Sequence, residues 1–333
     1  MKRLVGLLTL LILLIIACSN EETGKVLIIA GNGEPGFIDG ENAELNKPIR
    51  LAAYTDNSVV FADINNHAIR IATFDGKVTT IAGGPDKKGY QDGPAVDAKF
   101  NSPHGVAYDK TEDKIYVAEA GNHTIRIITK SENGTFEVST LAGIPGEAGF
   151  KDGAADSAMF ISPHAVILCP EGGVYVADIG NAKVRLIRNG KVSTVAENRT
   201  SDKENDTPNE TTFKYVMDIV VDGESILLAD AGLHLIDRII PNESVTTIQL
   251  NDTLSTPHGI AVDDKKNIYI ADMGTHRILK IDPGGNITPL VGSGKMGSKI
   301  NELKKPAAVL VHGDYLWIAD LENHQIKAIK INY

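Results

Sequence analysis

One short pattern recurs six times along the chain and constrains its fold more than any other feature. Each copy is a β-branched or aromatic run that ends in alanine followed by an acidic residue. The copies are VVFAD (59–63), IYVAE (115–119), VYVAD (174–178), ILLAD (226–230), IYIAD (268–272) and LWIAD (316–320). They lie roughly 40 to 60 residues apart, a period typical of propellers, solenoids and other repeat architectures. We therefore expect six similar units in series.

Each unit contains the same order of short strands. A first apolar run often follows a proline, as in SPHGVAYD (102–109), and the alanine–acid strand comes next. A polar corner leads to a third strand such as NHTIRIITK (122–130), and a turn leads to a fourth such as KVTTIAG (77–83). These runs are bounded by turn formers and show no sustained helical period. Four short strands per unit, repeated around an axis, predict an all-β propeller.

The two ends of the chain explain one irregularity of the repeat. The first five units each include a fourth strand, whereas the sixth ends with its third strand, in LWIADLENHQIKAIKINY (316–333). A spare strand of the fourth type, KVLIIAG (25–31), stands alone near the N-terminus. We predict that this N-terminal strand completes the last blade, so that a strand from each end closes the ring.

The whole unit, with its P-x-G-[VI]-A-x-D start, its N-H-x-[IV]-R corner and its V-x-T-[IL]-A-G strand, resembles the NHL repeat. The resemblance covers nearly all of the chain after residue 24 and implies a six-bladed β-propeller over residues 25–333. It is specific for the fold and a poor guide to function, because propellers of this kind include enzymes, protein-binding platforms and RNA-binding surfaces.

The first residues are typical of an export signal. Residues 1–17 contain a basic head and an apolar run too short for a comfortable membrane span. The sequence IIAC, ending at Cys18, resembles the lipobox of bacterial lipoproteins, in which the cysteine is lipidated. We expect a signal peptide over 1–17, lipidation at Cys18, a tether over 18–24, and anchoring of the exported protein to a bacterial membrane, at the outer membrane or cell surface. An ordinary cleaved signal or a membrane anchor is the alternative.

The charge and cysteine content narrow the choice of partners. The chain has 43 acidic and 33 basic side chains and a formal net charge of −10. This balance argues against nucleic acid or an anionic lipid surface as a partner of the folded body. After Cys18, only Cys169 remains, so no internal disulfide is possible, and Cys169 is expected to be a small buried core residue. We expect a monomer.

Polar residues that recur from blade to blade are expected to serve the scaffold. They include the histidines of the corner, the arginines three residues later, and the acids that end the second strand. The corner histidines are His67, His123, His234, His276 and His324. The segments between blades also recur, as GFIDG (36–40), GYQDG (89–93) and GFKDG (149–153), and predict structured turns whose Asp bonds backbone amides. A metal site made of three Asp residues is the alternative for these segments.

The informative position is one that varies between blades. The second residue of the first strand is Ile49, His104, His164, Met217, His258 or Ala307. Three histidines are thus expected at the channel mouth, partly exposed to solvent. Histidine is a common zinc ligand, so His104, His164 and His258 form a candidate site for a divalent metal, zinc or calcium. Other ligand-binding candidates are Arg50, Met217, Glu119, Asp178 and Asp272.

These histidines resemble, in part, the zinc ligands of the lyase domain that completes peptide amidation, a six-bladed propeller with P-H-G-like motifs. That lyase takes its histidines from alternate blades, whereas here they come from blades two, three and five, and no matching Tyr and Arg pair can be located. A scaffold role, in which each histidine bonds a neighbouring loop, and a site for a ligand other than a metal are the two alternatives.

Three functions therefore remain open. The first is a binding module that presents its loop-rich face to a protein, peptide or glycan. The second is a metal-assisted lyase or hydrolase at the channel mouth, and the third is a structural member of an envelope assembly. No cofactor is firmly indicated, and no G-x-S-x-G, H-E-x-x-H, P-loop or C-x-x-C motif is present.

Overall fold

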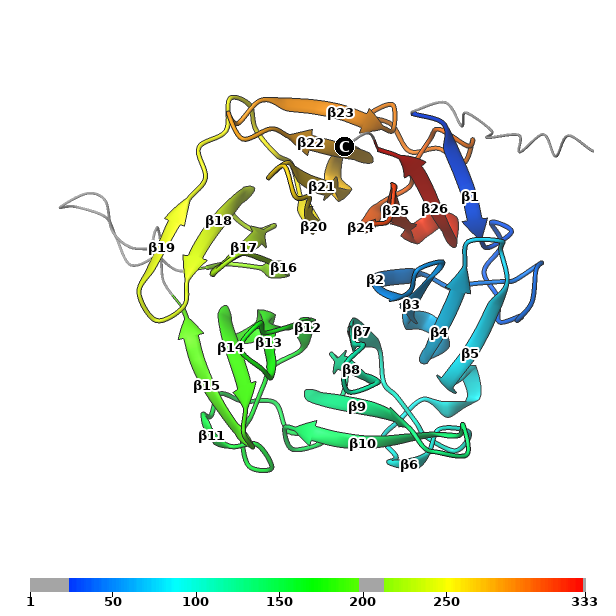
Figure 1. Ribbon diagram of the computed structural model, residues 1–333, viewed down its shortest axis with the longest axis vertical. Coiled ribbons are helices and arrows are strands. Elements are labelled where there is room, and N and C mark those ends of the chain that lie inside the picture. Colours follow the sequence, from blue (N-terminus) through cyan, green and yellow to red (C-terminus); the bar gives the residue numbers. More distant parts are fainter. Residues whose placement is uncertain (1–23, 198–212, 332–333) are drawn as a thin grey trace, which may run out of the picture.

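The computed structural model describes residues 24–197 and 213–331, which form six antiparallel sheets arranged as blades around a central axis (Figure 1). Each blade has four main strands, to which blades two and three add a short outer strand, and the first main strand of each blade lies innermost. The predicted all-β, six-bladed propeller is confirmed.

The first three blades follow one another in sequence. Blade one contains β2 (Pro48–Thr55), β3 (Ser58–Asp63), β4 (Ala68–Thr73) and β5 (Val78–Gly83). Blade two contains β7 (Pro103–Asp109), β8 (Lys114–Glu119), β9 (Thr124–Lys130), β10 (Phe136–Ala142) and the short outer strand β6 (Gly93–Pro94). Blade three contains β12 (Pro163–Leu168), β13 (Val174–Asp178), β14 (Lys183–Arg188), β15 (Lys191–Ala196) and the short outer strand β11 (Gly153–Ala154).

The other three blades have four strands each. Blade four contains β16 (Val216–Asp222), β17 (Ser225–Asp230), β18 (Leu235–Ile240) and β19 (Ser244–Thr247). Blade five contains β20 (Pro257–Val262), β21 (Ile268–Asp272), β22 (Arg277–Ile281) and β23 (Ile287–Val291). Blade six contains β24 (Pro306–His312), β25 (Tyr315–Asp320), β26 (Gln325–Lys330) and β1 (Val26–Ala30). Short 3-10 turns are η1 (Ile64–Asn66), η2 (Pro85–Lys87), η3 (Ile179–Asn181), η4 (Met273–Thr275) and η5 (Leu321–Asn323).

The ring is closed by the pairing of the two chain ends. Strand β1 lies antiparallel to β26, with Val26 opposite Ile329, and the two strands lie side by side in Figure 1. Val26 and Ile29 are only 4% and 6% exposed, so the N-terminal strand contributes apolar contacts as well as ladder bonds. The prediction that an N-terminal strand completes the last blade is confirmed.

The hydrophobic core is divided into six clusters, each of which lies between two neighbouring blades. In one cluster, Val60 and Ile69 of blade one pack with Val117 and Ile128 of blade two. The alanine before the acid is fully buried in every blade, at Ala62, Ala118, Ala177, Ala229, Ala271 and Ala319. Each blade therefore needs two neighbours to bury its two faces, which explains why the ring must close.

Several predictions about the N-terminus lie outside the described residues. These are the signal peptide over 1–17, the lipidation of Cys18 and all but the last residue of the tether over 18–24. In the described part of the chain, no helix is long and apolar enough to cross a membrane. Cys169 is a free thiol and only 5% exposed, which confirms its prediction as a buried core residue.

Candidate functional site

The acids that end the second strands belong to the scaffold. Each accepts a hydrogen bond from a backbone N–H just before the first strand of its own blade. For Glu119 this donor is the amide of Asn101, at 2.7 Å. The other pairs are Asn46–Asp63, Ile161–Asp178, Lys214–Asp230, Thr256–Asp272 and Lys304–Asp320. Glu119, Asp178 and Asp272 are at most 1% exposed, so the side chains of these three predicted ligand candidates are enclosed by the fold.

The long segments between blades, called crossings below, are held by buried arginines. In blade two, Arg126 donates to Glu119 at 2.9 Å, to the Gln91 carbonyl at 3.0 Å and to Asp92, while the Tyr90 ring lies 4.7 Å from its guanidinium carbon. Asp92 in turn accepts from the Thr140 amide at 3.1 Å. The predicted structured turn is confirmed.

The same arrangement occurs in blades one and three. There the arginines are Arg70 and Arg185, and the crossing aspartates are Asp39 and Asp152. Each of the three crossing aspartates is bonded within its own blade, which gives no support to a shared metal site made from them.

The corner histidines join one blade to the next. The Nδ1 atom of His67 accepts from the Ser102 amide at 3.1 Å, and His123, His276 and His324 accept from Ser162, Lys305 and Lys47 in the same way. All four have a left-handed backbone, and His234 shares it. The predicted role of the corner histidines, bonding loop backbone between blades, is confirmed for these four.

The channel is narrow because small residues line it. Residues Gly105, Ala165, Gly259 and Ala308 follow the variable position in blades two, three, five and six. A Cβ on Gly105 would lie 2.7 Å from the His164 carbonyl oxygen, and one on Gly259 would lie 2.6 Å from Cα of Ala308. Glycine is therefore required where these first strands meet. A cavity of about 100 Å³ remains inside, lined by residues of all six blades.

Arg50 spans this narrow channel. Its guanidinium donates to the carbonyls of Ala307 at 2.9 Å and His258 at 3.2 Å, and also to the Met217 carbonyl. It forms an ion pair with Asp218 at 3.4 Å. Burial lowers the pKa of Arg50 and raises the pKa of Asp218, and each partner opposes the shift of the other. Arg50, predicted as a ligand residue, thus ties blade one to blades four, five and six.

The three channel histidines do come together, as predicted. The rings of His104 and His164 stack with centroids 3.9 Å apart, and the His258 ring lies 6.1 Å from that of His104. The Nδ1 atoms of His104 and His258 lie 2.9 and 2.8 Å from the carbonyls of His164 and Ala307 in the next blades. This arrangement matches the scaffold alternative for two of the three.

The expected solvent exposure was wrong for two of these histidines. His104 and His258 are only 4% and 5% exposed, because the close first strands enclose them, whereas His164 is half-buried. Burial lowers the pKa of all three, to about 3 for His164, and Arg50 adds to the effect. The cluster is therefore electrically neutral at physiological pH.

The geometry does not fit a metal ion. Two of the imidazoles stack at an interplanar angle of 15°, and two Nδ1 atoms already lie against carbonyls. Across residues 24–197 and 213–331, no three His, Cys, Asp or Glu side chains are arranged so that they could hold a metal. The hypothesis of a zinc or calcium site at His104, His164 and His258 finds no support here.

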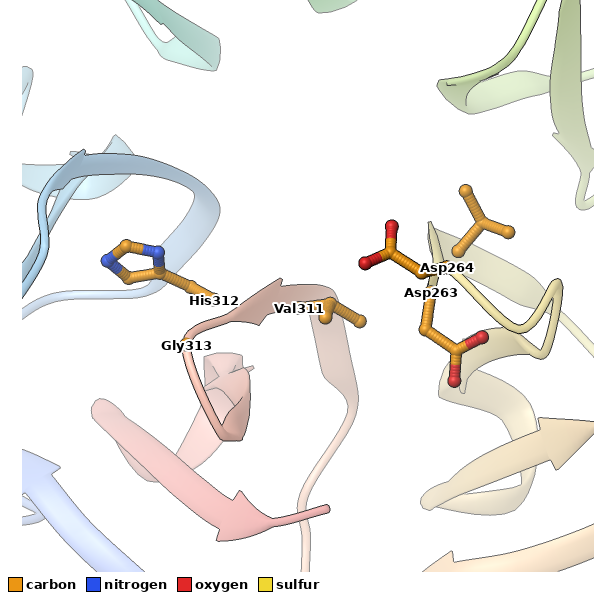
Figure 2. Close-up of a pocket in the computed structure, with 6 residues that line it drawn as sticks. Asp263, Asp264, Val311, His312 and Gly313 are labelled. Carbon is orange, nitrogen blue, oxygen red and sulfur yellow. The ribbon is translucent and has the colours of Figure 1, made fainter. Parts of the chain in front are cut away.

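The opposite end of the first strands carries a second hollow, which the repeat pattern did not indicate. Figure 2 shows Asp263 and Asp264 on one turn near Val311 and His312 on the turn of the next blade. The hollow has a volume of about 410 Å³. Asp263 accepts from the Asn267 amide and the Tyr269 hydroxyl, and His312 Nε2 lies 2.7 Å from the Thr55 carbonyl. Most of its polar groups are thus bonded within the fold.

Known proteins resemble this chain in sequence and in fold. The NHL repeat model matches residues 100–128 and 254–281. NHL repeat-containing protein 2 of Bos taurus is 27% identical over 338 residues, covering 84% of this chain and 45% of that protein. The chain spans less than half the length of the curated relatives it matches.

Two solved structures share the fold at low sequence identity. An auxiliary nutrient binding protein from Bacteroides ovatus is 14% identical, with a TM-score of 0.64, covering 92% of this chain and 76% of that one. A catalytically inactive virginiamycin B lyase from Staphylococcus aureus, with quinupristin, is also 14% identical, with a TM-score of 0.60, covering 92% of this chain and 99% of that one. Taken with the blades described above, these matches lead to one conclusion. The chain is a six-bladed β-propeller that contains NHL repeats.

Proposed function

We propose that this propeller is a binding module whose ligand site is the channel mouth on the face of the crossings. The observation that carries the proposal is the contrast between repeated and unrepeated polar groups. Polar groups that recur among the blades are bonded within the scaffold, whereas the cluster around Arg50 and His164 has one copy. A fold needs the same contacts in many blades, while a ligand needs a particular set of groups in one place.

The channel mouth also offers reachable side chains. His164 and Met217, on adjacent blades, are half-buried, so both keep part of their surface in contact with solvent. Methionine is flexible and polarisable and adapts to varied apolar partners. A protein, peptide or glycan is the ligand class that this face suits, and the resemblance to a nutrient-binding propeller of Bacteroides ovatus supports the same assignment. The described residues give a metal-assisted lyase or hydrolase no support, because the histidine geometry does not fit a metal.

Glycan and peptide arrays probed with the full-length chain test the site. Met217→Lys introduces a long charged side chain at the channel mouth, while Asp264→Lys places the same side chain on the exposed turn at the opposite face. We expect array ligands of the parent to be lost by Met217→Lys and kept by Asp264→Lys. The reverse pattern would move the site to the hollow in Figure 2, and the proposal would be wrong.

We propose further that Cys18 carries the lipid that holds a monomeric propeller at the outer membrane or cell surface of a bacterium. The support is the basic head, apolar run and IIAC sequence of residues 1–18. A single acyl chain binds membranes weakly, so at least two chains are expected. Cys18→Ser should release the protein from the membrane fraction, and a variant that remains there as fully as the parent would contradict the assignment.

A further inference from the structure

One hydrogen-bonding rule of the channel fails at a single place. In blades two and five, the histidine Nδ1 lies against the carbonyl at the variable position of the next blade. In blade three the corresponding carbonyl is that of Met217, but Arg50 already donates to it. Unlike those of His104 and His258, the Nδ1 atom of His164 is buried without a hydrogen-bond partner among the described residues.

A second nitrogen in the same cluster shares this condition. The terminal nitrogens of Arg50 bond three carbonyls, whereas its Nε is buried and has no partner in the described part of the chain. Leaving a buried polar group unsatisfied costs about 1–3 kcal/mol, and native proteins leave few such groups. Arg50 bonds the Met217 carbonyl and lies close enough to His164 to act on its charge, so two such groups in one cluster indicate a place for another molecule.

We propose that Arg50 and His164 bind the carboxylate of a small organic acid, or of a ligand's acidic terminus, at the channel mouth. This inference rests on the proposed function and names the chemistry of its ligand. The Nε–H of Arg50 can only donate, and His164 can donate from Nδ1 in one tautomer, so a carboxylate with two acceptor oxygens complements both. Met217 is half-buried on β16, the first strand next to the β12 strand of His164, and offers apolar surface to the rest of such a ligand.

The charge of the site predicts how binding depends on pH. The charged and titratable groups that act on His164 are Arg50, His104 and His258, and Asp218 pairs with Arg50. The Arg50–Asp218 pair is balanced and the histidines are neutral, so a carboxylate would add one uncompensated negative charge. Its field raises the pKa of His164 from the free value of about 3. The complex then binds more protons than the free protein. Affinity therefore rises as the pH falls from the pKa of His164 in the complex toward its pKa in the free protein.

Calorimetry with the full-length chain tests the carboxylate requirement. The probes are acetate and propionate, with acetamide and propionamide as uncharged analogues of matched shape. We expect the acids to bind at least tenfold more tightly than the amides, with proton uptake and rising affinity once the pH falls below the raised pKa of His164 in the complex. Equal binding of acids and amides, or no binding of the acids, would overturn the inference.

Two variants separate ligand binding from scaffold support. His164→Phe keeps a ring stacked on His104 but removes both nitrogens, so we expect at least tenfold weaker acetate binding and an unchanged or higher melting temperature. His164→Asn restores a polar atom near the Nδ1 position and should recover part of the binding. The control His276→Phe removes a corner nitrogen that bonds the Lys305 amide, so it should lower the melting temperature and leave acetate binding unchanged.

The outcomes distinguish this inference from the proposed function. Acetate binding by His164→Phe equal to that of the parent would show that His164 does not hold the carboxylate. If the arrays yield a ligand that Met217→Lys loses, but no carboxylate binds, the binding module stands and the carboxylate site is wrong. If acetate binds and no array ligand is lost by Met217→Lys, the carboxylate site stands and the protein, peptide or glycan assignment is wrong.

Discussion

Blades two and five share the same order of four main strands but differ at one buried position of the third strand. In blade two, Arg126 lies opposite Val117 and bonds Glu119, Asp92 and two carbonyls of the preceding crossing. In blade five, Leu279 lies opposite Ile270 at the corresponding place and is 2% exposed in an apolar cluster. Both blades keep the acid, since Asp272 accepts from the Thr256 amide at 2.6 Å just as Glu119 accepts from Asn101.

The crossings that precede the two blades explain the difference. The crossing before blade two runs from residue 84 to residue 102 and folds over its blade through the Gly89–Gly93 turn, whereas that before blade five runs only from 248 to 256. The acid accepts a hydrogen bond from the backbone just before the first strand, and every blade needs this contact. The arginine serves the long folded crossing, which blade five lacks, and leucine fills the same volume there.

Blades can be compared as units only while the ring is closed, so the strongest perturbation is at blade six. Deleting residues 25–31 removes β1, its ladder with β26 and the buried Val26 and Ile29. We expect a loss of about 5 kcal/mol or more in the free energy of unfolding, and aggregation through the exposed edge of β26. Thermal melts and light scattering measure both effects. An unchanged melting temperature would refute the clasp between the chain ends.

Exchanging the residues at the compared position should reveal their different partners. Arg126→Leu leaves the Glu119 carboxylate buried without its cation and should cost about 3–5 kcal/mol. Leu279→Arg buries a cation in an apolar cluster and should also destabilise the fold. Denaturant unfolding gives both values. The double variant Arg126→Leu/Glu119→Gln should recover part of the stability lost by Arg126→Leu. No recovery would show that the loss comes from the change in side-chain volume and not from the unpaired charge.

A smaller change loosens the crossing and leaves the blade intact. Asp92→Asn keeps the side-chain shape but weakens the bonds to Arg126 and the Thr140 amide, and the Asp92 side chain is 37% exposed. We expect the free energy of unfolding to fall by about 1 kcal/mol, and by less at high salt, which screens the ion pair. Hydrogen exchange should show faster opening of residues 89–100 while β8 stays protected. If the exchange of β8 speeds up as much as that of residues 89–100, the crossing also stabilises the blade itself.

The smallest expected effect concerns the corners. His123→Ala removes the acceptor of the Ser162 amide and should cost about 1 kcal/mol. Blade three already has Ala182 at its corner, in the same left-handed backbone. Ala182→Asn, a residue that tolerates that backbone, serves as the control and should change stability by less than about 0.5 kcal/mol. Equal melting temperatures for His123→Ala and the parent would show that the corner hydrogen bond does not stabilise the fold.

The sequence predicted the fold in detail because each blade obeys the same local rules. The alanine–acid strand and the unpaired KVLIIAG segment were sufficient for the blade count and the closure of the ring. The meeting of His104, His164 and His258 also followed from their common place in the repeat.

Burial within the channel was less accessible to sequence reasoning. It depends on the distance between first strands of different blades, which Gly105 and Gly259 allow to become very short. The role of Arg50 could not be derived, because its partners are backbone carbonyls, which have no sequence signature. The hollow beside Asp264 was missed for a similar reason, since its turns vary between blades.

The pairing of β1 with β26 also sets the order in which the protein can be completed during synthesis. Val26 leaves the ribosome about 300 residues before its partner Ile329, so β1 must wait for β26. Contacts between such distant segments form slowly, and an apolar strand that waits unpaired is exposed to aggregation in the meantime. Protease resistance of nascent chains should therefore appear only after β26 has emerged, and a shorter chain that is already resistant would contradict this order of assembly.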